Sequence, residues 1–119
     1  MTLANLIPPY SLEAEQGVLG GLMLDNGTWD LVADLLVPED FFRGEHRTIF
    51  KAIAALAQQN RPFDIVTLAD QLTEQPEMGG LAYLGELAKN TPSVANIKTY
   101  AEIVRERAHL RHLIQLGFA

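Results

Sequence analysis

The sequence predicts an all-α domain. Every segment with a clear hydrophobic period repeats apolar residues three and four positions apart, and no four-residue stretch alternates convincingly as a strand does. Proline, glycine and asparagine divide the chain into short segments, which predicts a compact globule of about six helices. The 119 residues suffice for one core, and the absence of cysteine excludes a disulfide framework and a thiolate metal site.

The first helix is predicted to begin after Ser11, a good N-cap that follows an extended entry set by Pro8 and Pro9. Glu13 and Glu15 fall in its first turn, where carboxylates favour the positive end of the helix dipole. Its buried stripe is expected to comprise Leu12, Val18, Leu19, Leu22 and Met23.

Three glycines, Gly17, Gly20 and Gly21, lie inside this first helix. Each costs about 1 kcal/mol relative to alanine in a helix interior. We expect close packing to compensate for that cost, because another helix can approach the backbone where no Cβ stands.

A short second helix is predicted between a turn at residues 25–27 and Pro38. Its apolar residues stand at positions i, i+3, i+4 and i+7: Trp29, Val32, Ala33 and Leu36. Trp29 is expected to anchor the core. Residues 39–42 then form a turn or a single helical turn that places two aromatic rings.

The third helix has the most regular apolar stripe of the chain, and it is predicted to stop near Asn60, before Arg61 and Pro62. The stripe comprises His46, Ile49, Phe50, Ile53, Leu56 and Ala57. Because His46 lies on this stripe, we interpret it as a hydrogen-bonded core histidine rather than a metal ligand.

Two shorter helices are predicted next. Asp64 caps the fourth, whose stripe is Ile65, Leu68, Ala69 and Leu72. Pro76 and the pair Gly79-Gly80 break the chain before a fifth helix that carries Leu81, Leu84 and Leu87. A turn at residues 90–92 precedes Ser93, which is predicted to cap the sixth helix.

The last helix carries two apolar lines about 130 degrees apart. The first line comprises Ile97, Tyr100, Ala101, Val104 and Ala108. The second line comprises Ile103, Leu110, Leu113 and Ile114. A compact domain covers one such line, so the second predicts a contact with another helix or another subunit, or else an apolar end packed loosely on the body.

The charge distribution gives an acidic body and a mildly basic last helix. The net charge of the chain is −6, and the stretch up to Ile97 carries five basic and thirteen acidic residues. Four basic residues follow it: Lys98, Arg105, Arg107 and Arg111. The balance opposes a surface that neutralises phosphates by itself, although a small nucleic-acid-binding module that uses these four residues is the alternative interpretation.

Catalytic chemistry is not predicted for this chain. It contains no G-x-x-x-x-G-K-[ST] string to hold nucleotide phosphates and no dinucleotide fingerprint, so we expect no cofactor. His109 and His112 stand three apart but among arginines, which disfavours a metal site. Asp30 and Asp34 are interpreted as solvated acids. A small hydrolase is improbable because no nucleophile has a partnered histidine.

The sequence predicts a cytoplasmic protein with no membrane partner. Its apolar runs are far shorter than the roughly 20 residues that span a bilayer, and its N-terminus lacks a basic start followed by an apolar run.

Two framing segments resemble the N-terminal domain of the bacterial replicative DNA helicase, the DnaB type. Residues 7–23 read IPPYSLEAEQGVLGGLM near the start. Residues 89–93 read KNTPS and residues 100–108 read YAEIVRERA near the end. The likeness extends from about Ile7 to Arg111, because the residues between the two segments also follow the order of the family.

The resemblance implies a small helical globule followed by a helical hairpin, six copies of which form a collar above the ring of ATP-driven motor domains. It implies self-association, docking of the primase C-terminal domain, and at most weak or indirect contact with single-stranded DNA. ATP and magnesium would belong to the motor, which travels 5′ to 3′. The contacts that it implies for primase are Glu13 and Tyr83, although Glu13 also suits a helix N-terminus and Tyr83 a half-buried position.

The resemblance also implies a division of the chain. Residues 1–10 form an extended segment, residues 11–92 the helical body, and residues 93–119 the first arm of a hairpin truncated at Ala119. The second line of the last helix, from Ile103 to Ile114, is then the expected hairpin or oligomer interface. We expect a fragment of a longer protein that is a monomer or a weak dimer. The connection Gln75–Met78 is shorter than the family leads us to expect, which should alter only an exposed loop.

Overall fold

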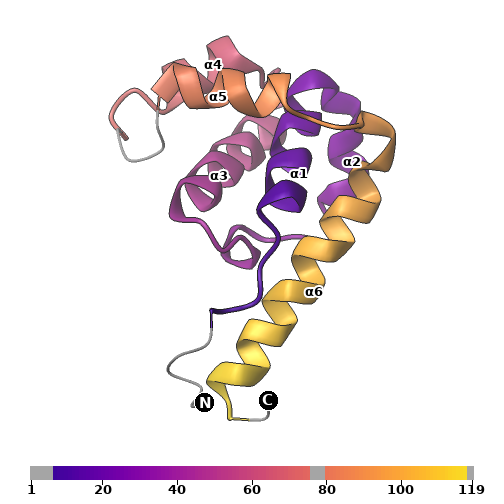
Figure 1. Cartoon of the computed structure of the whole chain (residues 1–119). Helices are drawn as coiled ribbons and strands as arrows, with labels where there is room; N and C mark the ends of the chain where they lie inside the picture. The colour runs from indigo at the N-terminus through magenta and orange to yellow at the C-terminus, as the bar shows by residue number, and fades with distance from the viewer. Residues whose placement is uncertain (1–6, 76–79, 118–119) are drawn as a thin grey trace.

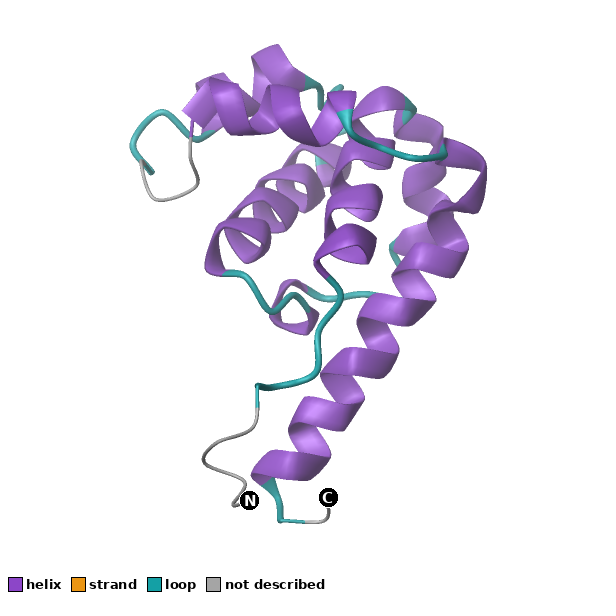
Figure 2. Cartoon of the chain, viewed as in Figure 1, coloured by secondary structure: helices purple, strands orange, loops and turns teal. Residues whose placement is uncertain are grey.

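The computed structural model describes residues 7–75 and 80–117, and six α-helices make up most of these ranges. They are α1 (Leu12–Leu24), α2 (Trp29–Val32), α3 (Gly44–Gln58), α4 (Ile65–Gln71), α5 (Gly80–Lys89) and α6 (Ile97–Gln115). Three short 3₁₀ turns join them: η2 (Asn26–Thr28), η3 (Pro38–Asp40) and η5 (Val94–Asn96). The described ranges contain no strand, so the predicted all-α class is confirmed (Figure 2).

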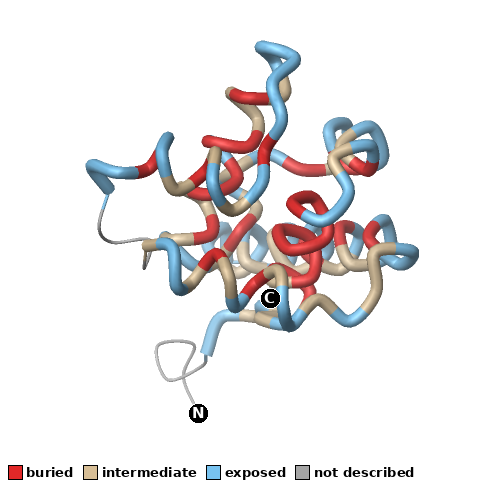
Figure 3. The backbone as a smooth tube through the Cα atoms, turned by 90° about the horizontal axis from the view of Figure 1, so that it is seen from above, coloured by how far each residue is buried: buried red, intermediate tan, exposed pale blue. Residues whose placement is uncertain are grey.

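The helices gather around α1. In Figure 1, α3 and α6 lie on opposite sides of α1, while α4 and α5 cross near its C-terminal end. The C-terminal half of α6 extends beyond this body toward the N-terminal segment. Buried residues occupy the centre of the body, as the view from above shows (Figure 3). They include the predicted stripe of α3, from His46 to Leu56, and most of the predicted stripe of α1.

The glycines of α1 lie where other helices touch it, which confirms the expected close packing. Gly20 is the most tightly enclosed: a Cβ there would stand 1.9 Å from Thr91 Oγ1 and 2.3 Å from the Leu87 carbonyl oxygen. At the other two positions the nearest atoms belong to α6: a Cβ added at Gly17 would stand 2.8 Å from the Tyr100 ring, and one added at Gly21 would stand 2.9 Å from Ile97 Cδ1. These contacts fix α5 and α6 against α1.

Two predicted caps are confirmed by their hydrogen bonds. Ser11 Oγ accepts from the Ala14 N–H at 3.2 Å at the start of α1. Asp64 Oδ1 accepts from the Thr67 N–H at 2.9 Å, and Thr67 Oγ1 accepts from the Asp64 N–H at 2.8 Å, so the two residues form a capping box. The predicted end of α3 is confirmed as well, because Asn60 has a φ of 56°.

Two local predictions were wrong. Ser93 does not cap α6: the turn η5 intervenes, and the Ser93 side chain makes no capping hydrogen bond. Ala33 is exposed although its N–H bonds the Trp29 carbonyl and continues the turn of α2, because Val32 and Leu36 occupy the buried side. The predicted fifth helix is confirmed, with Leu84 and Leu87 buried and Leu81 exposed in its first turn.

Some predictions lie outside the described residues. Pro76 and Gly79 are among them, as are residues 1–6 of the predicted extended segment and most of the connection from Gln75 to Met78. Among the helices that the structure describes, none is both long and apolar enough to cross a bilayer.

Candidate functional site

A buried acid and a buried histidine meet between α1 and α3. Glu15 is 1% exposed and His46 is 0% exposed. Glu15 Oε1 lies 2.7 Å from His46 Nδ1. A carboxylate can only accept, so Nδ1 carries the hydrogen of this bond. The interpretation of His46 as a hydrogen-bonded core histidine is confirmed, whereas Glu15 does more than face the dipole of its own helix.

The same carboxylate also holds the backbone that leads into α3. Its Oε2 accepts from the Phe42 N–H at 2.7 Å, and its Oε1 accepts from the Arg43 N–H at 3.4 Å. These N–H groups stand at the positive end of α3, where an anion is favoured. The desolvation cost of burying Glu15 is therefore offset by three donors, and no buried side-chain nitrogen or oxygen in the described residues lacks a partner.

Tyr83 of α5 completes a chain of hydrogen bonds from the core toward the surface. Its hydroxyl lies 2.6 Å from His46 Nε2, and the two rings stack with 12° between their planes. Gln16 Nε2 donates to the same hydroxyl over 3.5 Å, a long and weak bond. Burial raises the pKa of the Tyr83 phenol, so the hydroxyl stays protonated at neutral pH. We name Glu15, His46 and Tyr83 the polar relay.

The two residues that the resemblance assigns to primase contact lie on the same flank of the body. Glu13 is exposed on α1 and stands one helical turn before Gln16, which bonds Tyr83. Tyr83 is half-buried. The charges of Glu45 and Glu86 act on its phenol in one direction and that of Arg43 in the other, and Arg43 pairs with Glu45. We name the surface formed by Glu13, Gln16 and Tyr83 the α1/α5 flank.

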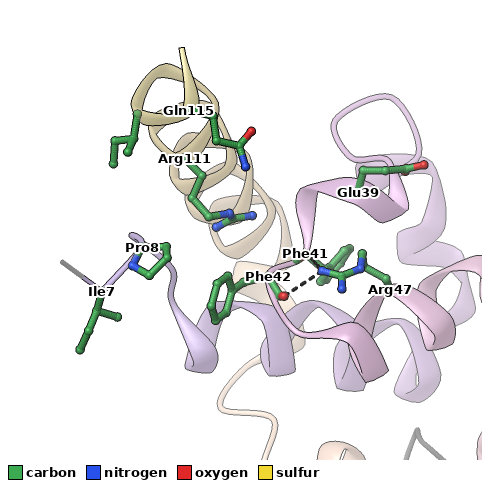
Figure 4. A pocket seen from close by; sticks show the side chains of 9 residues that line it. Ile7, Pro8, Glu39, Phe41, Phe42, Arg47, Arg111 and Gln115 are labelled. Carbon is green, nitrogen blue, oxygen red and sulfur yellow. Dashed lines mark hydrogen bonds between the residues drawn. The ribbon is translucent and has the colours of Figure 1, made fainter. Parts of the chain in front are cut away.

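A second candidate surface is a groove between the N-terminal segment, η3 and the C-terminal half of α6. Figure 4 shows the groove, which encloses about 380 Å³. Arg111 closes one wall by donating to the Pro9 carbonyl at 2.8 Å and to the Asp40 carbonyl at 2.6 Å. Its guanidinium lies 5.5 Å from the ring centre of Phe42, which stacks on Tyr10 at 4.4 Å. Burial lowers the pKa of Arg111 below its ordinary value.

The predicted interface residues of α6 fall into two groups. Ile103 is half-buried against the core, and Ile114 is half-buried and lines the groove. Leu110 and Leu113 are 41% and 44% exposed and share one face of the helix. The expectation that the chain leaves the second line uncovered thus holds for the two leucines and not for the two isoleucines, which the body and the N-terminal segment reach. The first line is buried as predicted at Ile97, Ala101 and Val104.

The arginines proposed for the alternative nucleic-acid module are engaged by their own chain. Arg105 donates to the Leu35 carbonyl at 2.7 Å, Arg107 pairs with Glu106, and Arg111 closes the groove. Of the four basic residues of that alternative, Arg107 is thus paired with an acid, and Lys98 is exposed.

The described residues hold no group of three or more histidines, cysteines or acids arranged to bind a metal. His109 Nε2 accepts from Arg105 Nε at 3.3 Å, and His112 lies on the exposed side of α6. Asp30 and Asp34 are both exposed.

Comparison with known protein families gives a match over most of the chain. Residues 7–106 match the family described as the DnaB-like helicase N terminal domain. The chain is 48% identical over 116 residues to the replicative DNA helicase DnaB of Pasteurella multocida, covering 95% of this chain and 25% of that protein. It is 46% identical over 112 residues to the replicative DNA helicase DnaB of Geobacillus stearothermophilus, covering 92% of this chain and 25% of the relative. The chain thus spans about a quarter of the length of these relatives.

Two solved structures share the fold. The crystal structure of the N-terminal domain of DnaB helicase from Mycobacterium tuberculosis superposes with a TM-score of 0.90 at 39% identity, over 93% of this chain and 81% of that one. A structure of a DnaB-like replicative helicase, described together with its interactions with primase, superposes with a TM-score of 0.81 at 29% identity. That second match covers 90% of this chain and 26% of the other.

Proposed function

This chain belongs to the family of DnaB-like helicase N-terminal domains, and on that basis we propose that it is the assembly and primase-docking domain of a hexameric replicative helicase. The observation that carries the proposal is the family match over residues 7–106, which includes the whole α1/α5 flank. The related helicase whose structure was described with its interactions with primase supports docking as the activity. The whole protein would unwind DNA 5′ to 3′ at the replication fork in the bacterial cytoplasm.

We assign no catalysis to this chain. Nucleotide hydrolysis needs a phosphate-binding loop and a magnesium ligand, and the sequence contains no such string. ATP and magnesium would act in a motor domain outside this chain. The proposed division places the globular body at residues 11–92 and the first hairpin arm at residues 93–119.

The α1/α5 flank is the proposed primase contact, and Glu13 and Tyr83 are its central residues. Glu13 is an exposed carboxylate on a helix whose N-terminus is already capped by Ser11, so its charge is available to a partner. Tyr83 is an aromatic ring held at a fixed angle by His46, and rigid aromatic side chains are frequent binding hot spots.

Titration of this chain with the purified C-terminal domain of primase tests the docking proposal. We expect Glu13→Ala and Tyr83→Ala each to weaken binding about thirtyfold or more, since loss of a hot-spot residue costs at least about 2 kcal/mol. Asp30→Ala is the matched control, because it removes an exposed carboxylate from α2 instead. Unchanged affinity in both variants, with intact melting temperatures, would remove the α1/α5 flank from the interface.

We propose that Leu110 and Leu113 contact a second helix or a neighbouring subunit in the full-length hexamer. Two large apolar side chains on one face of an exposed helix are favoured to be covered. In sedimentation experiments we expect this chain alone to be a monomer or a weak dimer, and Leu110→Ser with Leu113→Ser to abolish any dimer. A stable hexamer of this chain would contradict the proposal that assembly needs the rest of the protein.

Single-stranded DNA should bind this chain weakly or not at all. Titration with a labelled oligonucleotide at low and high salt distinguishes docking from the alternative nucleic-acid module. Tight binding with a steep salt dependence would restore the alternative.

A further inference from the structure

The polar relay has a fixed direction, which follows from the chemistry of its first member. The Glu15 carboxylate accepts at both oxygens, so the bond at 2.7 Å requires a hydrogen on His46 Nδ1. In an uncharged imidazole the other nitrogen, Nε2, then has no hydrogen and can only accept. The hydroxyl of Tyr83, 2.6 Å away, must donate to it.

In its uncharged form the His46 ring can donate only from Nδ1 and accept only at Nε2. His46 lies in the first turn of α3 and is fully buried. The Glu15 carboxylate beside it also accepts from the Phe42 and Arg43 N–H groups that precede α3, and its charge acts on Arg111, so several donors share that charge.

We propose that Glu15 and His46 are positioning residues that turn the hydroxyl hydrogen of Tyr83 inward, so that a docking partner meets its oxygen only as a hydrogen-bond acceptor. Gln16 holds that oxygen by a bond of 3.5 Å, which a stronger donor can replace. Which macromolecule docks rests on the proposed function, whereas the direction of the relay does not.

The chemistry of the partner group follows from this direction. With Arg43 paired to Glu45, the remaining acids near this acceptor oxygen are Glu86 and the exposed Glu13, and they fit a donor with positive charge, such as a guanidinium or an ammonium group. A carboxylate or a carbonyl would meet a lone pair and like charge. We infer that the partner presents arginine or lysine to the α1/α5 flank, and that the relay selects for it.

Glu15→Gln reverses the relay with little change of shape. The amide oxygen is expected to face the Phe42 N–H, which makes the shorter of the two backbone bonds. The amide N–H₂ then donates to His46 Nδ1, the ring hydrogen moves to Nε2, and the Tyr83 hydroxyl turns outward as a donor. Glu45→Gln is the matched control for the direction of the relay, because it also removes one carboxylate charge near the start of α3, and Glu45 pairs with Arg43 rather than with the relay.

Nitrogen NMR of the histidine rings shows which nitrogen of His46 carries the hydrogen, and the measurement needs no docking partner. We expect a hydrogen on Nδ1 alone in the unaltered chain, in Glu45→Gln and in Tyr83→Phe, and a hydrogen on Nε2 alone in Glu15→Gln. The exposed His109 and His112 serve as internal references. A ring of the unaltered chain that carries its hydrogen on Nε2, or on both nitrogens, at neutral pH overturns the inference.

The affinity for the primase C-terminal domain measures what the direction of the relay contributes to docking. We expect Tyr83→Phe and Glu15→Gln each to weaken binding roughly tenfold, the value of one hydrogen bond to a charged group. The double variant should be no weaker than Tyr83→Phe alone, because both changes act through one hydroxyl. Additive losses, or unchanged binding in Tyr83→Phe, would contradict the inference.

The proposed docking function and the inferred direction of the polar relay can be contradicted independently. If the unaltered chain carries its hydrogen on Nδ1 but does not bind the primase domain, the proposed function is wrong and the direction of the relay stands. If it binds but the hydrogen lies on Nε2, the inference is wrong and the proposed function stands. If Glu15→Gln proves to be unfolded by circular dichroism, the ring of the unaltered chain and the affinity of Tyr83→Phe still decide.

Discussion

The two halves of α6 have similar apolar residues and opposite surroundings. In the first half, Ile97 and Val104 are almost fully buried against the body. In the second half, Leu110 and Leu113 lie on the exposed side, and Arg111 makes the polar contacts to the body. One helix thus serves as a core element and then as a surface. The difference shows that apolar content sets what a helix is able to bury, whereas the elements nearby decide what it does bury.

Gly20→Ala tests the enclosed side of this comparison with the largest expected effect. The added Cβ would stand 2.3 Å from the Leu87 carbonyl oxygen, so α5 must move away from α1. We expect the free energy of unfolding in urea to fall by about 4 kcal/mol, because backbone cannot yield as a flexible side chain does.

Gly85→Ala is the control for the change of residue type. Gly85 lies inside α5, and its added Cβ would meet no atom within 4 Å. We expect this variant to be more stable than the unaltered chain by about 0.5–1 kcal/mol, the helix propensity of alanine over glycine. A similar loss in both variants would mean that the packing of α1 is not what Gly20 serves.

Ile97→Ala and Leu113→Ala compare the two halves of α6 directly. Truncation of the fully buried Ile97 leaves a cavity beside Gly21, and we expect a loss of about 3 kcal/mol in the free energy of unfolding. Truncation of the half-exposed Leu113 should cost less than about 0.5 kcal/mol. Equal losses would show that a contact in solution covers the second half.

The buried faces of the helices were predicted well from the sequence, because hydrophobic periodicity indicates which face of a helix is buried. The apolar stripe of α3, the caps at Ser11 and Asp64, and the role of the glycines all depend on local spacing. Local spacing failed where a 3₁₀ turn replaced helix, as at Ser93.

The polar relay was not predicted, because it joins three helices across 31 and 37 positions of the chain. A signal for part of it was present. Glu15 stands at i−3 and i−4 from the buried Val18 and Leu19, which places a carboxylate on a core stripe. His46 begins the stripe of α3 in the same way. A buried acid and a buried histidine are favoured to pair, because a polar group in the core needs a hydrogen-bond partner. That Tyr83 is the third member depends on how α5 crosses α3, which no local pattern contains.

Arg111→Met tests what holds the second half of α6 to the rest of the chain. The variant keeps an apolar stem of similar reach and removes the donors to Pro9 and Asp40. We expect a loss of about 1 kcal/mol and faster amide hydrogen exchange in residues 105–115, because the end of the helix loses its polar attachment.

Arg107→Met is the control for charge on the same helix, since Arg107 pairs with Glu106 at the surface. It should change stability by less than about 0.5 kcal/mol and leave exchange unchanged. Equal amide exchange in the two variants would show that the end of α6 holds its position without the hydrogen bonds of Arg111.

An effect of similar size, confined to one helix end, belongs to the N-cap Asp64 of α4. The Thr67 N–H lowers the pKa of Asp64 by bonding its carboxylate at the start of α4. Asp64→Ala should cost about 1 kcal/mol at neutral pH, the usual value of an N-cap.

Because the folded pKa of Asp64 lies below the ordinary value of 3.8, this contribution is complete above that pH. It disappears as the pH falls through the folded pKa. Urea unfolding of both chains should therefore show an equal difference at neutral pH and about pH 5, and a shrinking one toward about pH 3. Asp70→Ala, on the exposed face of the same helix, is the control. A difference that stays constant to low pH would mean that the neutral carboxyl caps α4 as well as the charged one.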